Sequence, residues 1–284
     1  MTQTNNSAPI IAFQGFEGAY SDMACRAVYP QAQTLPCHTF DKAFAAVKDG
    51  KADLAMIPVD NTLAGRVADV HRLLPQSGLH IIGEYFLPIC HALMGIKGAS
   101  LDDIETVHSH VHALPQCRDI IKELSLKEKV HADTAGAAQA VAHMAQKSEG
   151  AIASPLAAEI YGLDILKENV QDADHNTTRF LILSRADAVP AYEENHTYLT
   201  SFLFEVRNIP AALYKALGGF ATNGVNMVKL ESYVDEQFQA ALFFAEVMAH
   251  PEERGLKFAL EELDFFAKKV MVLGTYPAHA FRTQ

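Results

Sequence analysis

Residues 200–206 read Thr-Ser-Phe-Leu-Phe-Glu-Val, and this apolar run opens the pattern that decides the fold of the last third of the chain. The pattern predicts, in order, a strand at 200–206, a helix at 210–221, strands at 226–234 and 240–247, a helix at 251–268 and a strand at 270–276. Leu213, Leu217 and Phe220 recur at the spacing of one helical face. Pro210 and Pro251 are expected in the first turns of the two helices, where a missing N–H is tolerated. The order βαββαβ predicts a ferredoxin-like domain.

The first two-thirds of the chain alternates short apolar runs with helical periodicity, beginning with Ile-Ile-Ala-Phe at 10–13. Further strands are expected at 53–59, 81–82, 85–90, 107–108, 151–153 and 179–183. Helices are expected near 21–29 and around 71–74, and at 115–124, 135–146 and 154–161. This alternation predicts a twisted α/β sheet with helices on both faces, whose ligands bind beyond the carboxyl ends of the strands. The periodicity ends between Ala186 and His196, where we expect the domain boundary.

The charge balance of the 284-residue chain argues against a nucleic-acid partner, because 23 Lys and Arg face 34 Asp and Glu for a formal net charge of −11. An anionic substrate would need a local positive field, from an arginine or from helix N-termini. The apolar stretch 79–96 is interrupted by Glu84, Pro88 and His91, so no membrane span is expected. Residues 1–9 lack the features of a secretory signal, and the four cysteines form no close pair, so a cytoplasmic location is expected.

Residues 176–180, Asn-Thr-Thr-Arg-Phe, place hydroxyls, a carboxamide and a guanidinium at the entrance of an apolar strand. Arg179 could grip a carboxylate with two hydrogen bonds, and a threonine hydroxyl could donate to an oxygen that gains charge. An ordinary loop that leads into a strand is the alternative interpretation.

The histidines at 108, 110 and 112 alternate along an extended segment, as metal ligands can. We favour no metal, because no carboxylate or cysteine completes the set at a recognised spacing and Pro115 indicates a turn soon after. Ser109 and the neighbouring backbone amides could instead form an anion-binding loop before a helix.

Two further polar segments follow predicted strands. Residues 15–21 hold two glycines before a helix but lack the spacing of a nucleotide-binding loop, and Ser21 could be a helix N-cap or a ligand contact. Asn61 and Thr62 close the next strand, and Arg66 is a second candidate partner for a carboxylate, with a solvated polar turn as the alternative.

These four segments, in this order before a βαββαβ tail, resemble the prephenate dehydratase family over roughly residues 9–282. The family pattern Gly-Pro-Glu-Gly-Thr-Phe-Ser corresponds to residues 15–21, with departures at Phe16, Ala19 and Tyr20. Its Glu-Asn-Ser-x-x-Gly corresponds to 60–65 and its Ser-His-x-x-Ala-x-x-Gln-Cys to 109–117. The Asn-x-Thr-Arg-Phe signature is intact at 176–180.

The resemblance implies a two-lobed catalytic domain at 8–186, of the type II periplasmic-binding-protein kind, with lobes at about 8–83 plus 174–186 and at 84–173. It implies the loss of CO2 and water from prephenate to give phenylpyruvate, for phenylalanine biosynthesis. No cofactor and no metal are expected, since no hydride moves. The resemblance assigns Thr178 as the catalytic hydroxyl. It assigns the following substrate-binding residues: Ser21, Asn61, Thr62, Ser109, Asn176 and Arg179.

The tail at 197–276 resembles the ACT domain of the same family, which implies allosteric regulation by phenylalanine. The effector-binding residues are then expected to be Ala212, Leu213, Asn226, Glu231 and Ser232. Tyr233 and Val234 replace the family's arginine and proline after Ser232, so the strength and sign of the response stay open. A homodimer or homotetramer is expected. Arogenate dehydratase, a non-catalytic amino-acid or anion-binding protein, and a regulatory subunit acting through the ACT domain are the alternatives.

Overall fold

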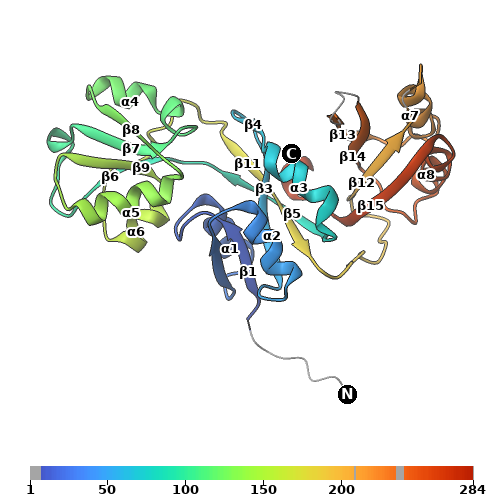
Figure 1. The fold of residues 1–284 in the computed structure, drawn as a ribbon, viewed down its shortest axis with the longest axis horizontal. Coiled ribbons are helices and arrows are strands. Elements are labelled where there is room, and N and C mark those ends of the chain that lie inside the picture. The colour runs from blue at the N-terminus through green and yellow to red at the C-terminus, as the bar shows by residue number, and fades with distance from the viewer. Residues whose placement is uncertain (1–7, 208, 235–239, 284) are drawn as a thin grey trace. The chain divides into compact units, whose positions relative to one another are not determined.

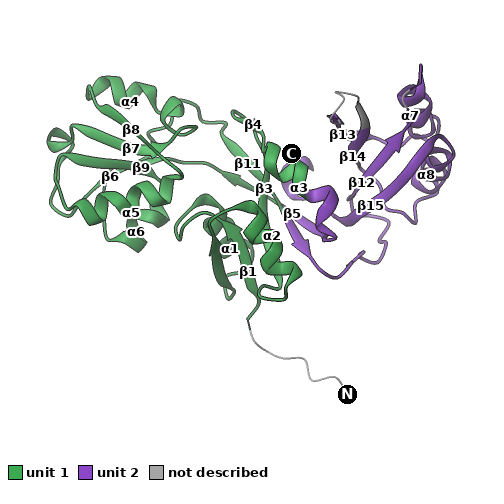
Figure 2. Ribbon diagram, viewed as in Figure 1, with its two compact units in different colours: residues 1–73, 85–181 green, residues 74–84, 182–284 purple. Residues whose placement is uncertain are grey.

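The computed structural model describes residues 8–207, 209–234 and 240–283. The chain divides into two compact units, which are coloured separately in Figure 2. The first unit comprises Met1–Leu73 and Tyr85–Leu181, and the second comprises Leu74–Glu84 and Ile182–Gln284. Each unit has its own hydrophobic core.

The first sheet has the strand order β2-β1-β3-β11-β5, and the short strand β4 pairs with β3 (Figure 1). Its strands are β1 (Ile10–Gln14), β2 (Gln33–Cys37), β3 (Leu54–Asn61), β4 (Gly65–Arg66), β5 (His80–Pro88) and β11 (Thr177–Ser184). The associated helices are α1 (Tyr20–Val28), α2 (Phe40–Lys48) and α3 (Ala68–Ser77). β1 pairs in parallel with both β2 and β3, and its residues Ile11, Ala12 and Phe13 are fully buried. A near-continuous apolar run is what a parallel strand covered on both faces requires.

The second sheet of the first unit has the order β10-β6-β9-β7-β8. Its strands are β6 (Ala92–Gly95), β7 (Thr106–His110), β8 (Lys127–His131), β9 (Glu149–Ala153) and β10 (Asp164–Lys167). The helical segments are η1 (Leu101–Asp103), η2 (Leu114–Gln116), α4 (Arg118–Glu123), α5 (Thr134–Met144) and α6 (Pro155–Tyr161). A buried cluster that includes Leu93, Val107, Ile121 and Ile152 forms the core under this sheet. Two separate α/β sheets therefore confirm the predicted two-lobed α/β class.

The second unit contains β12 (Tyr198–Val206), α7 (Ala212–Thr222), β13 (Met227–Val234), β14 (Ala240–Val247), α8 (Arg254–Phe266), β15 (Ala267–Pro277) and η3 (Ala280–Thr283). Its antiparallel sheet has the order β13-β14-β12-β15, which is the ferredoxin-like arrangement predicted from the sequence. Phe202 stacks on Phe220 of α7 with ring centroids 5.6 Å apart, and Leu256 and Leu263 of α8 are fully buried. The helices thus cover the sheet with the apolar faces that their spacing predicts.

Both helices of this unit begin later than expected, so the placement of Pro210 and Pro251 in their first turns is wrong. Ala211, the N-cap of α7, has a left-handed backbone with φ 61°, which keeps the preceding residues out of the helix. Before α8, the Glu253 carboxylate accepts the His250 backbone N–H at 2.6 Å and closes a separate turn that contains Pro251.

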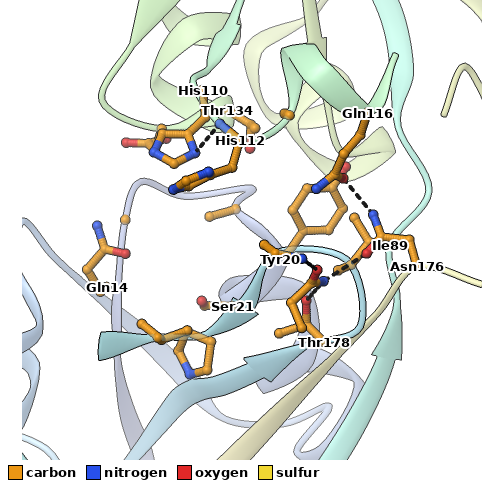
Figure 3. Close-up of a pocket in the computed structure, with 18 of the residues that line it drawn as sticks. Gln14, Tyr20, Ser21, Ile89, His110, His112, Gln116, Thr134, Asn176 and Thr178 are labelled. Atoms are coloured by element: carbon orange, nitrogen blue, oxygen red, sulfur yellow. Dashed lines mark hydrogen bonds between the residues drawn. The ribbon is translucent and has the colours of Figure 1, made fainter. Parts of the chain in front are cut away.

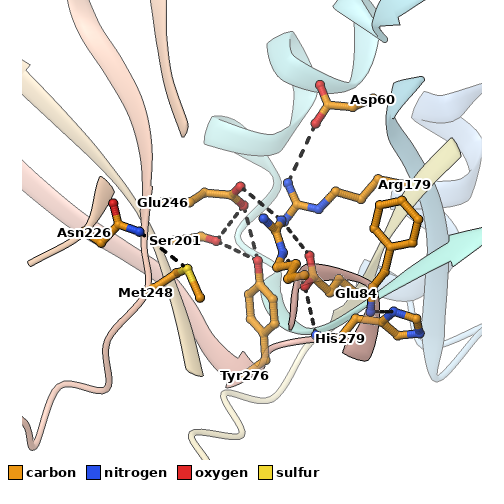
Figure 4. Close-up of polar contacts among 11 residues, drawn as sticks. Asp60, Glu84, Arg179, Ser201, Asn226, Glu246, Met248, Tyr276 and His279 are labelled. Atoms are coloured by element: carbon orange, nitrogen blue, oxygen red, sulfur yellow. Dashed lines mark hydrogen bonds and ion pairs between the residues drawn. The ribbon is translucent and has the colours of Figure 1, made fainter. Parts of the chain in front are cut away.

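A buried polar network ties the C-terminal η3 segment to the rest of the second unit (Figure 4). The Arg282 guanidinium donates from Nε to Glu84 Oε1 at 2.7 Å and from Nη2 to Glu84 Oε2 at 2.9 Å. Its Nη2 lies 4.0 Å from Glu246 Oε2, and the other carboxylate oxygen of Glu246, Oε1, accepts from the hydroxyls of Ser201 and Tyr276. The carboxyl side chains of Glu84 and Glu246 are both fully buried, so the guanidinium supplies positive charge to two buried anions.

The four cysteines are all unpaired thiols: Cys25, Cys37 and Cys117 are buried and Cys90 is exposed. Burial raises the pKa of Cys25 and of Cys37, and it raises the pKa of Cys117 to about 12. Among the helices of the described residues, none is long and apolar enough to cross a bilayer.

Candidate active site

A cavity of about 240 Å³ lies in the first unit and is lined by residues of both of its sheets (Figure 3). Its polar lining residues are Gln14, Tyr20, Ser21, Asn61, His91, His110, His112, Gln116, Asp133, Thr134, Asn176 and Thr178. Its other lining residues are Gly15, Ala19, Pro58, Ala64, Val67, Ile89, Ala113, Ala132 and Phe180. Four residues assigned to the site from the sequence, Ser21, Asn61, Asn176 and Thr178, meet in this cavity.

Thr178 lies at the beginning of β11, directly across from the end of β3. Asn61 Nδ2 donates to Thr178 Oγ1 at 2.9 Å and to Asn176 Oδ1 at 2.8 Å. The two strands are neighbours in the sheet, and therefore segments separated by more than a hundred residues join at one point. The arrangement holds the threonine hydroxyl at the cavity wall.

The hydrogen bonds continue from Asn176 to residues that were not assigned to the site from the sequence. Asn176 Nδ2 donates to Gln116 Oε1 at 2.7 Å, and His91 Nε2 lies 3.2 Å from the same oxygen. The hydroxyl of Tyr20 lies 2.6 Å from His91 Nδ1. Burial lowers the pKa of His91 and raises the pKa of Tyr20 well above its usual value, so both groups are neutral near pH 7.

Ser21 is buried in the first turn of α1 and lines the cavity, so its alternative role as an N-cap is wrong. The N-cap is Ala19, whose side chain makes no capping hydrogen bond. Nearby, the buried Asp22 carboxylate accepts the Gly18 N–H at 2.9 Å and pairs with Arg26 at 3.0 Å. The helix therefore presents its N-terminal end to the cavity, where its dipole favours an anion.

Three other residues assigned as substrate contacts, Thr62, Ser109 and Arg179, do not line the cavity. Thr62 Oγ1 donates to the His175 carbonyl at 2.7 Å and accepts from the Thr177 N–H at 2.9 Å. These two hydrogen bonds connect the end of β3 to the segment that leads into β11. Ser109 is fully buried and donates to the Ile152 carbonyl at 2.6 Å.

Arg179 is also buried, and its Nη1 lies 3.7 Å from the Asp60 carboxylate (Figure 4). Successive side chains of a strand point to opposite faces, so Thr178 and Arg179 cannot both face the cavity. The carboxylate beside Arg179 is therefore that of Asp60, whereas the sequence analysis proposed a carboxylate of the substrate.

The alternating histidines separate into two environments. His108 is fully buried, with Nδ1 2.8 Å from His131 Nε2 and Nε2 2.5 Å from Glu149. His110 and His112 instead line the cavity, with ring centroids 5.1 Å apart. Burial and the neighbouring His112 lower the pKa of His110. No group of three or more His, Cys, Asp or Glu side chains within residues 8–207, 209–234 and 240–283 is placed to hold a metal ion.

One carboxyl side chain, that of Asp133, is among the cavity-lining residues. It is the N-cap of α5 and accepts the Gly136 N–H at 2.6 Å. Burial raises the pKa of Asp133, because the charged form loses hydration. Hydroxyl, amide and imidazole groups thus outnumber anions in the lining, which suits an anionic substrate.

A second cavity, of about 520 Å³, lies in the second unit beside the start of α7. Ala212, Leu213 and Ser232, three of the residues that the resemblance assigned to the effector, line it. Asn226 and Glu231 do not: Asn226 Nδ2 lies 3.7 Å from the Met248 sulfur, and Glu231 lies 3.7 Å from Lys229. Tyr214 and Phe243 are further lining residues that the sequence did not single out.

Residues 11–188 match the model of the prephenate dehydratase family. A bifunctional N-acyl-homoserine lactone acylase/prephenate dehydratase of Komagataeibacter europaeus is 52% identical over 98% of this chain and 99% of the relative. Arogenate dehydratase/prephenate dehydratase 1 of Arabidopsis thaliana is 38% identical over 96% of this chain and 73% of the relative. The solved prephenate dehydratase of Arthrobacter aurescens in complex with L-Phe is 29% identical, with a TM-score of 0.87 over 96% of this chain and 91% of that one. This likeness confirms the fold class over nearly the whole chain, and the chain belongs to the prephenate dehydratase family.

Proposed function

We propose that this chain is a prephenate dehydratase in which the Thr178 hydroxyl assists departure of the ring hydroxyl group. The observation that carries the proposal is the placement of Thr178 Oγ1 at the cavity wall, held at 2.9 Å by the Asn61 amide. In the reaction the bond to the ring carboxylate breaks, its electron pair aromatises the ring, and the C4 hydroxyl leaves and is protonated to water. Hydrogen-bond donation to that oxygen stabilises the charge that develops on it.

Substrate binding in this proposal relies on neutral donors and helix dipoles. Prephenate carries two carboxylates, and the chain has a net charge of −11, so the positive field must be local. The N-terminal ends of α1 and α5 lie at the cavity through Ser21 and Thr134. His110, the last residue of β7, and His112 in the following loop supply further donors. An additional carboxylate acid would repel the dianion, which favours a hydroxyl in this role.

The direct test measures phenylpyruvate formed from prephenate at neutral pH, with an enzyme-free control because prephenate aromatises unaided in acid. Replacing Thr178 by valine keeps the shape of the side chain and removes the hydroxyl. We expect kcat to fall by about a hundredfold or more, the usual scale for a positioned proton donor. Thr177→Val, one residue earlier in β11, is the matched control and should retain kcat within about threefold. A Thr178→Val enzyme with near-normal kcat would remove the assignment.

Regulation by phenylalanine is the second part of the proposal. The L-Phe complex of the Arthrobacter aurescens relative and the cavity beside α7 support an effector site at Ala212, Leu213 and Ser232. In the proposed organisation, residues 8–186 form the catalytic domain, 197–276 form the ACT domain, and the ACT domains assemble as a dimer or tetramer. Calorimetry with phenylalanine, in parallel with light scattering, tests both points. Absence of binding heat would remove the effector site.

A second candidate activity is hydrolysis of N-acyl-homoserine lactones. The Komagataeibacter europaeus relative, at 52% identity over 98% of this chain, carries that activity in its name. The apolar part of the cavity lining, which includes Val67, Ile89 and Phe180, could contact an acyl chain. Release of homoserine lactone from a hexanoyl substrate would support this activity, and the same assay mixture with prephenate or arogenate would rank the three substrates.

A further inference from the structure

We propose that Gln116, His91 and Tyr20 are positioning residues for the Thr178 hydroxyl. They extend a one-directional chain of hydrogen bonds whose direction is set by two backbone N–H groups. The inference rests on the proposed role of Thr178, and it adds an account of which way the hydroxyl proton points.

The chain starts at the turn between β3 and β4. Asn61 Oδ1 accepts from the backbone N–H of Leu63 at 2.9 Å and of Ala64 at 2.7 Å. A backbone N–H can only donate, so the oxygen of this carboxamide must face the turn. Its NH2 group therefore faces Thr178 and Asn176, and it also lies 3.3 Å from the Thr177 carbonyl, which can only accept. Two backbone N–H groups and one backbone carbonyl therefore fix the orientation of the Asn61 amide.

The fixed amide determines the direction of the Thr178 hydroxyl. Because Asn61 donates to Thr178 Oγ1, the threonine proton cannot lie on the line to Asn61. It is directed away from Asn61, and the side chain lines the cavity. A threonine in this state meets the substrate as a donor, which is what the leaving hydroxyl needs.

The orientations of two further side-chain amides, those of Asn176 and Gln116, follow from that of Asn61. Asn176 Oδ1 accepts from Asn61, so Asn176 Nδ2 faces Gln116 and donates to Gln116 Oε1 at 2.7 Å. The other neighbour of that oxygen, His91 Nε2 at 3.2 Å, must then carry a proton. Each amide in the chain is oriented by the one before it.

Tyr20 ends the chain. With the proton of neutral His91 on Nε2, the Nδ1 atom is an acceptor, and the Tyr20 hydroxyl donates to it at 2.6 Å. The Cys90 carbonyl lies 3.0 Å from the same hydroxyl and offers a second acceptor. Tyr20 stands where the family pattern has phenylalanine, which has no hydroxyl to make this last link.

The tautomer of His91 is the first test, because it needs neither substrate nor turnover. In the full-length protein labelled with 15N-histidine, long-range 15N–1H correlation spectra distinguish a protonated Nε2 from a protonated Nδ1, and His91→Gln identifies the signal. We expect the proton on Nε2, with the Nδ1 resonance shifted in Tyr20→Phe. A proton on Nδ1 would overturn the inference even if the enzyme turns over prephenate normally.

Two substitutions at Gln116 then separate positioning from simple packing. Gln116→Met has similar length and no acceptor, and it should lower kcat about tenfold while KM changes less than twofold. Gln116→Glu keeps an acceptor oxygen for Asn176 and His91, so it should lower kcat less than Gln116→Met does, whereas the added negative charge raises KM for the dianion. Equal losses of kcat in both variants would overturn the inference.

Asn61→Asp reverses the polarity at the start of the chain. Its carboxylate still accepts from Leu63 and Ala64 but also accepts from Thr178, which draws the threonine proton away from the substrate. We expect kcat to fall about as far as in Thr178→Val, about a hundredfold. A normal kcat in Asn61→Asp together with a low kcat in Thr178→Val would retain the proposed function and overturn the chain.

Discussion

Replacing Arg282 by methionine should destabilise the second unit by about 3–5 kcal/mol, the usual cost of removing one partner of a buried ion pair. The guanidinium makes two charge-assisted hydrogen bonds to Glu84, at 2.7 and 2.9 Å. Its own side chain is 17% exposed, so solvent cannot replace it fully. Methionine retains most of the aliphatic contact, and therefore the measured loss reports mainly the charge.

The assay is urea unfolding followed by circular dichroism, with hydrogen exchange to locate the effect. The amides of β15, which leads into η3, should lose protection by a factor of about a hundred or more if they open with the second unit. The chain has no tryptophan that would report on this region by fluorescence.

A double-mutant cycle identifies the cause of the loss. Glu84→Gln combined with Arg282→Met removes both charges of the pair, and we expect the double variant to recover about 1–3 kcal/mol relative to Arg282→Met alone. Losses that simply add would show that the two side chains do not interact. A loss below about 1 kcal/mol in Arg282→Met would mean that the pair behaves like an exposed ion pair, and it would refute the reasoning.

Three further predictions concern the first and second units. Gly18→Ala should lower stability by about 2 kcal/mol or more, measured as the urea midpoint, because its φ is 83° and a Cβ would lie 2.8 Å from Ala157 Cα; an unchanged midpoint would contradict this. Leu263→Ala should cost about 2–5 kcal/mol in the same measurement, since the side chain is fully buried, whereas a loss below 1 kcal/mol would mean that the core of α8 closes around the gap. Burial lowers the pKa of His91 below its unfolded value of about 6.5, so the unfolded chain binds the proton first. Stability should therefore be complete above pH 6.5 and fall as the pH drops below it, with a smaller fall in His91→Gln; an equal pH dependence in the two proteins would refute the assignment.

Strong periodicity explains why the order of elements in the second unit could be predicted. In α8, Leu256, Ala259 and Leu263 are buried at helical spacing within a 13-residue helix, and β12 is a nine-residue strand that is buried along nearly its whole length, so both elements were long enough to recognise. Their starts were less accurate, because the backbone of Ala211 and the hydrogen bond between His250 and Glu253 depend on local geometry that spacing does not encode.

The strand β8 was not predicted, and its composition explains the omission. Lys-Glu-Lys-Val-His at 127–131 lies at the edge of its sheet and is mostly exposed. The strand therefore has no buried face, and its sequence shows no alternation of apolar and polar residues. β2, at the edge of the other sheet, contains Pro36 and was missed for a similar reason.

The sequence predicted only some of the polar residues that line the candidate site. Asn61, Asn176 and Thr178 came from two segments with family-like motifs, and the neighbouring strands β3 and β11 bring them together. Ser109 and Arg179 belong to similar motifs but do not line the cavity. The Ser109 hydroxyl donates to the Ile152 carbonyl, and the Arg179 guanidinium lies beside the Asp60 carboxylate.

The role of His91 had little signal in the sequence. It was noted only as a polar interruption of an apolar stretch, and burial of a polar side chain in such a stretch is the sign that could have identified it. Gln116 and Tyr20 lay within the quoted motifs, yet only the folded arrangement shows that they contact the same histidine.

The contrast among the four thiols offers a way to watch the site directly. Cys90 is exposed and its carbonyl contacts the Tyr20 hydroxyl, whereas burial keeps the other three thiols protonated and hard to reach. A maleimide dye should therefore attach at a single position without prior removal of any native cysteine. In a chain that lacks tryptophan, a dye on Cys90, which lies between the cavity-lining residues Ile89 and His91, would give an optical signal during substrate binding.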